Sequence, residues 1–156
     1  MPFVVRINTD IKIGYMLVYG HAMFSEVVQA ASEPDYDPVN RPRVKIIMDF
    51  RNCDLETDLE GMKMFVNFLQ NLEKIGFEME PTAYLTTQKA LSIFLKALGL
   101  LIEDTAEIRQ AFSSLDDAIV WLGETENASI IHQIHDELLR EVRSKRWNPS
   151  VENKSP

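Results

Sequence analysis

Residues 44–75 place a buried strand, a polar segment and a long amphipathic helix in direct succession, and this arrangement restricts the chain to few folds. The strand is the near-continuous apolar run VKIIMDF at residues 44–50, which is typical of a strand covered on both faces. The polar segment RNCDLE follows at residues 51–56, and a helix is predicted at residues 58–75. In α/β proteins a central strand that leads through a polar loop to a helix N-terminus commonly carries the functional site.

The patterns on either side of this segment predict alternating strands and helices. The predicted elements are strands at residues 3–8, 11–19, 44–50, 81–86 and 105–112, and helices at residues 21–32, 58–75, 88–103 and 115–122. Residues 33–43 contain three prolines and are predicted to form a loop. The predicted fold class is α/β, with a mixed, mostly parallel sheet that opens with a β-hairpin and is covered by helices.

A further amphipathic helix is predicted after this unit. The chain is therefore divided into a domain at residues 1–123, an appended amphipathic helix within residues 124–146, and a polar tail at residues 147–156 that is predicted to be disordered. The apolar stripe of the appended helix either packs on its own domain or contacts another molecule, including a second copy in a homodimer. The pattern favours neither arrangement over the other.

Composition excludes several classes of partner. The net charge of −8 disfavours binding to nucleic acids and to anionic membrane surfaces. Cys53 is the sole cysteine, so an intrachain disulfide and a zinc–thiolate cluster are both excluded.

No signal-peptide pattern and no apolar run of the roughly 20 residues that span a bilayer occurs, so a cytoplasmic location is expected. Motifs for nucleotide binding and hydrolase chemistry are also missing, so neither a cofactor nor an enzymatic activity is expected.

Three segments carry a resemblance to a known family. They are DPVNRPRVKIIMDFRN at residues 37–52, TTQKALSIFLKALG at residues 86–99 and RQAFSSLDDAIVWLG at residues 109–123. With the order of the predicted elements, they resemble the STAS domains, which include the SpoIIAA-like anti-sigma-factor antagonists and small stand-alone bacterial proteins. The resemblance spans about residues 3–123 and does not include the C-terminal helix.

The resemblance implies a non-enzymatic signalling module that docks a protein partner through the loop after the central strand. In the antagonists that loop carries a Ser-Ser-Gly-Leu motif, and a partner kinase phosphorylates one of its serines. Here the corresponding residues 53–58 contain no serine and no Gly-Leu pair, and Thr57 lies closest to the family's serine. The residues expected to form the docking or switch loop are Asp49, Arg51, Asp54, Thr57 and Asp58.

Two of these positions have a simpler structural interpretation as well. Thr57 is either a phosphoacceptor at a helix N-terminus or the first residue of a capping box with Glu60. Asp49 and Arg51 either orient a ligand or pair with each other.

Three other residues could carry chemistry. Cys53 is reactive only if nearby positive charge lowers the pKa of its thiol, and it is otherwise an inert side chain. His132 and His135 lie three residues apart, so they could share a metal if a third ligand joined them; otherwise they form a solvated helix face.

The alternative function is binding of a small apolar ligand or lipid between the sheet and its helices. Some related folds, such as the CRAL-TRIO lipid-transfer domains, enclose an apolar ligand in this way. Residues 94–102, Met62 and Met64 are the predicted lining of such a pocket, although they also suit an ordinary core.

Overall fold

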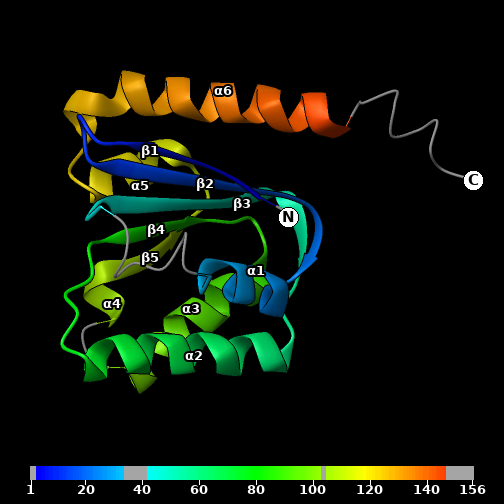
Figure 1. Ribbon diagram of the computed structural model, residues 1–156, viewed down its shortest axis with the longest axis vertical. Coiled ribbons are helices and arrows are strands. Elements are labelled where there is room, and N and C mark those ends of the chain that lie inside the picture. The colour runs from blue at the N-terminus through cyan, green and yellow to red at the C-terminus, as the bar shows by residue number, and fades with distance from the viewer. Residues whose placement is uncertain (1–2, 34–41, 103–104, 147–156) are drawn as a thin grey trace, which may run out of the picture.

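The computed structural model describes residues 3–33, 42–102 and 105–146 and shows a five-stranded sheet between two layers of helices (Figure 1). The strand order is β1-β2-β3-β4-β5, in which β1 is antiparallel to β2 and the other neighbouring pairs are parallel. The strands are β1 (Phe3–Asn8), β2 (Ile13–Met23), β3 (Lys45–Glu56), β4 (Thr82–Leu85) and β5 (Arg109–Phe112). The helices are α1 (Phe24–Ala31), α2 (Leu59–Lys74), α3 (Lys89–Leu101), α4 (Thr105–Ile108), α5 (Leu115–Trp121), the 3-10 turn η1 (Thr125–Asn127) and α6 (Ala128–Arg146). The predicted fold class, a mixed sheet that opens with a hairpin and is covered by helices, is confirmed.

Each face of the sheet has its own apolar core. On one face, residues of α1, α2 and α3 pack against β2, β3 and β4, and this cluster includes Phe24, Val28, Phe65, Leu91 and Leu98. On the other face, residues of α5 and α6 pack against β1 to β4, and this cluster includes Ile13, Ile47, Ile119, Ile131 and Leu138. Figure 1 shows α6 on one side of the strands and α1, α2 and α3 on the other. The apolar spacing that predicted these helices therefore corresponds to their buried faces.

Helix α6 packs on its own sheet. It contacts β1 and β2, and both Ile131 and Leu138 are fully buried in the second core. Of the two arrangements that the sequence left open, the described residues show intramolecular packing. A homodimer stays a prediction, for which the outer side of this helix, with Ile130 40% exposed, is available.

Two of the central strands are longer than predicted. Strand β2 continues to Met23, so α1 begins at Phe24 rather than at His21. Strand β3 continues to Glu56, so residues 51–56 are strand and the prediction of a loop there is wrong. Both strands extend further because their added residues pair with each other: residues 19–23 of β2 are in parallel register with residues 52–56 of β3. These paired segments are here called the ribbon.

Other differences are smaller. Residues 105–108 form the short helix α4, and only Arg109–Phe112 form the predicted edge strand, as β5. Most of the predicted loop at residues 33–43 and all of the predicted disordered tail at residues 147–156 lie outside the described residues. Among the helices that the structure describes, none is long and apolar enough to cross a bilayer.

Gly61 allows α2 to approach the start of α1 closely. A β-carbon at this position would lie 2.4 Å from the Ser25 backbone nitrogen and 2.9 Å from the Phe24 carbonyl carbon. We expect Gly61→Ala to lower the free energy of unfolding by about 1–3 kcal/mol, because the backbones of two helices must separate. Urea unfolding measures this change, and Leu59→Ala, which truncates a 65% exposed side chain on the same turn, is the control. A Gly61→Ala protein as stable as the control would contradict the close approach.

Candidate functional site

The predicted docking residues lie in three different environments. Asp49 and Arg51 lie within β3, beneath α6, and Asp49 is fully buried. Asp54 lies on the ribbon with its side chain 80% exposed. Thr57 and Asp58 form the connection between β3 and α2. The residues that the sequence predicted as one docking loop are therefore not all at the surface, because Asp49 is buried beneath α6 whereas Asp54 is exposed.

Asp49 is the centre of a buried hydrogen-bonded cluster. Its carboxylate accepts from the Tyr15 hydroxyl at 2.7 Å, and from Arg51 through Nε at 3.0 Å and Nη2 at 2.8 Å. The Arg51 backbone N–H donates to the same carboxylate at 3.1 Å. The side chain of His135, on α6, lies above the cluster, with Nε2 3.9 Å from Asp49 Oδ2 and its ring 6.0 Å from that of Tyr15. Of the two interpretations of Asp49 and Arg51, the structure shows that they pair with each other.

The electrostatics keep this cluster in one protonation state. Burial raises the pKa of Asp49, but hydrogen bonds from Arg51 and Tyr15 and the charge of Arg51 outweigh it, so the net shift is downward. Burial, together with the neighbouring Asp49 carboxylate, raises the pKa of Tyr15 above its usual range. Asp49 is therefore an ionised acceptor and Tyr15 a neutral donor at physiological pH.

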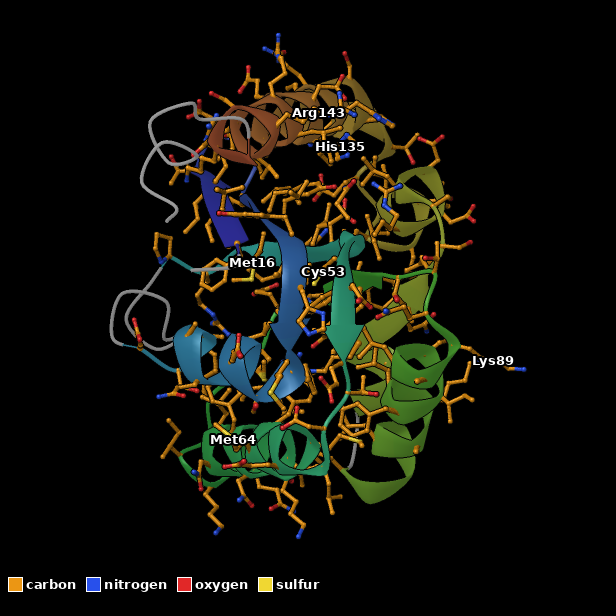
Figure 2. The ribbon with its side chains drawn as sticks, turned by 90° about the vertical axis from the view of Figure 1, so that its right-hand side faces the viewer. Met16, Cys53, Met64, Lys89, His135 and Arg143 are labelled. Atoms are coloured by element: carbon orange, nitrogen blue, oxygen red, sulfur yellow. The ribbon has the colours of Figure 1, made fainter. Side chains whose placement is uncertain are left out.

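A β-bulge separates Asp49 from the ribbon. Leu17 pairs with Asp49 and Tyr19 with Asn52, so β3 contains one more residue than β2 over this stretch. The extra residue reverses the alternation of side chains, and Cys53 joins the core on the α1–α3 face rather than the cluster beneath α6. Figure 2 shows His135 on α6 and Cys53 nearer the middle of the molecule. The ionisable set of Asp49, Arg51 and Cys53 that an enzyme would need therefore does not converge.

The start of α2 is capped by Asp58. Its carboxylate accepts from the Gly61 backbone N–H at 3.1 Å and from the Ser25 backbone N–H, at the start of α1, at 3.0 Å. Desolvation raises the pKa of Asp58, but these backbone hydrogen bonds outweigh it and lower the pKa. The capping box with Thr57 as first residue is therefore wrong, because the helix begins one residue later than that motif requires. Thr57 itself is half-buried.

The ribbon presents an acidic surface. The side chains of Asp54 and Glu56 are 80% and 61% exposed, and that of His21, on the neighbouring strand, is 67% exposed. His21 Nδ1 lies 3.2 Å from Asp54 Oδ2, and its Nε2 lies 4.0 Å from Glu56 Oε2. Buried Cys53 and Leu55 alternate with these residues, so the ribbon has one buried and one exposed face.

The histidines of α6 have separate partners. His132 Nε2 lies 2.7 Å from Asp116 Oδ1, whereas His135 faces the Asp49 cluster and also pairs with Asp136. In the part of the chain that the structure describes, no group of three or more metal-ligating side chains occurs.

A cavity of about 80 Å³ lies between the sheet and the α1–α2 layer. Its wall includes Phe24, Val28 and Phe65, together with the buried guanidinium of Arg109 from β5. Among the described side chains, the cavity wall includes neither Met62 nor Met64 nor any of residues 94–102, which the sequence predicted as the pocket lining. Met62, Met64 and Phe94 pack against the core instead, and Leu95, Leu98 and Ile102 belong to it.

Sequence analysis did not identify Arg109. Strand β5 directs Arg109 and Ala111 toward the α1–α3 face and Phe112 toward the α5–α6 face. Helices cover the face of Arg109, which is 7% exposed although β5 lies at the edge of the sheet. This cover is a tertiary contact, which the local sequence does not indicate.

Comparison with known proteins gives matches among solved structures only. No family model matches the chain. A search of curated proteins also finds no match. Among solved structures, the chain is similar to an uncharacterised DUF3478-family protein with a SpoIIAA-like fold from Shewanella loihica PV-4, at 15% identity and a TM-score of 0.48, over 77% of this chain and 91% of that one.

Two further similar structures are of SpoIIAA itself. The phosphorylated form of the Bacillus cell fate determinant SpoIIAA has 15% identity and a TM-score of 0.48, over 75% of this chain and 96% of that one. The unphosphorylated form of this anti-sigma factor antagonist has 10% identity and a TM-score of 0.39, over 76% of this chain and 94% of that one. The search thus returns the SpoIIAA-like fold that the sequence resemblance names. At these identities and TM-scores the likeness carries no argument about function, which is argued below from this chain's own residues.

Proposed function

We propose that this chain is a non-enzymatic regulatory module that docks a basic protein partner at the ribbon. The docking surface consists of Asp54, Glu56, Thr57, Asp58 and Leu59. The observation that carries the proposal is the exposure of this surface, with the side chain of Asp54 80% exposed and Leu59 65% exposed. An exposed apolar side chain beside outward-facing carboxylates suits an interface with a small apolar centre and a charged rim.

The docking surface is preorganised. Asp58 joins the starts of α1 and α2 through its hydrogen bonds to Ser25 and Gly61. The buried pair of Asp49 and Arg51 holds the bulge from which the ribbon extends. A surface held in this way loses little conformational entropy on binding. Asp49 therefore supports the surface but, being fully buried, does not touch the partner.

The charge of the surface specifies the chemistry of the partner. Asp54, Glu56, Asp58 and Glu60 are close in sequence, and the imidazole of His21 lies within 4.0 Å of the carboxylates of Asp54 and Glu56. A partner that presents lysine or arginine is therefore attracted, and the net charge of −8 extends this attraction beyond the contact. Phosphorylation of Thr57 would add negative charge at the same place, so as a phosphoacceptor Thr57 would strengthen docking to a basic partner.

Charge reversal on the ribbon tests this function. Asp54→Lys/Glu56→Lys is expected to weaken partner binding by about tenfold or more, because opposite charges across the interface become like charges. The immobilised wild-type protein is used to capture proteins from an extract of its source cells, and the dissociation constant of the captured protein is then measured with each variant.

The matched control carries the same change of charge elsewhere. Glu126→Lys/Asp136→Lys reverses two exposed acidic residues on η1 and α6 and should bind as the wild type does. If both double variants bind the partner equally well, or lose it equally, the ribbon is not the docking surface.

A further inference from the structure

The cavity between the sheet and the α1–α2 layer contains a buried charge for which the described residues supply no acidic partner. Arg109 is 7% exposed and lines the cavity. Its Nη1 donates to the Tyr84 hydroxyl and its Nη2 contacts Met79 Sδ at 3.2 Å. The guanidinium also lies 5.6 Å from the centre of the Phe65 ring. Among the described residues, no carboxylate forms an ion pair with it.

These contacts leave the charge of Arg109 largely uncompensated. Burying a guanidinium is costly unless an anion is paired with it, and a thioether sulfur is a weak acceptor. Burial raises the pKa of Tyr84 more than Arg109 lowers it, so Tyr84 is a neutral phenol and does not supply the missing negative charge. The aromatic rings contribute a cation–π attraction, which returns only part of the cost of burial.

The rest of the cavity wall is mainly apolar. On the α1 and α2 side it includes Phe24, Val27, Val28 and Phe65. At the rim, Arg43 pairs with Glu78 at 3.6 Å and with Glu80 at 3.9 Å. The rim carboxylates therefore already have a cation of their own, and among the described residues no carboxylate occupies Arg109.

We propose that this cavity binds a small amphiphilic monocarboxylate, with the carboxylate on Arg109 and the hydrocarbon part against α1 and α2. A guanidinium matches a carboxylate in planar, two-point geometry, which neither a neutral alcohol nor an aromatic ring offers. The volume of about 80 Å³ is roughly half of an engineered cavity that holds benzene, so the enclosed part takes the carboxylate and a few carbons. A longer chain would have to continue past the rim.

This site is separate from the docking surface. The cavity lies at the N-terminal ends of β3 and β4, where Val44, Ile46 and Thr82 line it, whereas the docking surface follows the C-terminal end of β3. Loss of partner docking and loss of ligand binding are therefore independent outcomes.

Hexanoate, 1-hexanol and hexyl phosphate are suitable probes, because they share a chain and differ in the head group. Ligand-observed NMR titration of the wild-type protein should show hexanoate binding at millimolar concentration, about tenfold more tightly than 1-hexanol and more tightly than hexyl phosphate. Arg109→Met should reduce the preference for hexanoate over 1-hexanol to about one. The ratio of the two affinities is the readout, because a general loosening of the fold would weaken both probes together.

Two further variants keep the test independent of the folding of Arg109→Met. Val28→Phe fills the apolar part of the cavity and should abolish binding of both probes while Arg109 is kept. Arg6→Met removes a 43% exposed arginine that pairs with α6 and should leave the preference unchanged. No hexanoate binding at millimolar concentration, an equal affinity for 1-hexanol, a tighter affinity for hexyl phosphate, or a preference that survives Arg109→Met would each overturn the proposal.

Discussion

Replacing Ile131 with alanine is expected to lower the free energy of unfolding by about 2–5 kcal/mol. Ile131 lies on α6, is fully buried and belongs to the core formed with α5 and the sheet. Truncating it removes apolar contacts and leaves a cavity, because the helix is held on both sides of this position by partly buried Ala128 and buried Ile134. Urea-induced unfolding followed by circular dichroism measures the change.

The preceding residue provides a matched control. Ile130 is also an isoleucine on α6 but is 40% exposed, so Ile130→Ala should cost less than about 1 kcal/mol. The pair of variants tests whether α6 is an integral part of the folding unit or an appendage to a domain that is complete at residue 123. Equal, small effects of the two substitutions would show that the sheet is stable without this helix.

The sequence predicted the fold class because its strongest patterns reflect burial. The apolar run at residues 44–50 occupies the centre of the sheet, and Ile47 and Phe50 are almost fully buried. The apolar spacing within residues 58–75 likewise placed Phe65 and Leu69 in the core. Apolar patterns of this kind predict the observed burial because apolar burial is the largest favourable contribution to folding.

The ribbon could not be predicted from its composition. Asp54 and Glu56 are poor strand formers, and their alternation with Cys53 and Leu55 is too short to distinguish a strand from a loop. What makes the segment a strand is its pairing with residues 19–23, which is a contact between distant parts of the chain. The burial of Arg109 depends in the same way on distant parts of the chain, the helices that cover its face of β5.

The candidate docking residues were only partly distinguishable from sequence. The spacing of Asp49 and Arg51 allowed them to pair, but their burial depends on α6, which the family resemblance does not include. Asp58 was predicted as the first residue of the helix and as part of the docking loop, and its hydrogen bond to Ser25 requires α1 and α2 to meet. The function of such residues depends on which helix covers them, and that is decided by the tertiary fold.

Asp49→Asn is expected to lower the free energy of unfolding at neutral pH by about 3 kcal/mol, at the low end of the range for breaking a buried ion pair. The amide cannot accept both hydrogen bonds from Arg51 as a carboxylate does, and it leaves the Tyr15 hydroxyl with a weaker acceptor. The low end applies because the Arg51 side chain is 25% exposed and can be rehydrated. Asp54→Asn, at an 80% exposed carboxylate on the same strand, should change stability by less than about 0.5 kcal/mol.

The pH dependence of the stability difference between wild type and Asp49→Asn shows whether the charge of Asp49 causes that difference. Because the pKa of Asp49 is lower in the folded protein than in the unfolded chain, its contribution to stability is fully present above the unfolded value of about 3.9. That contribution is lost as the pH falls through the lower, folded pKa, since protonation then favours the unfolded state. Urea unfolding from pH 7 to about pH 3 should therefore show the gap between wild type and Asp49→Asn becoming smaller at the acid end. A gap that stays constant with pH would mean that the substitution acts through packing alone, and the charge of Asp49 would then have no part in holding the bulge behind the ribbon.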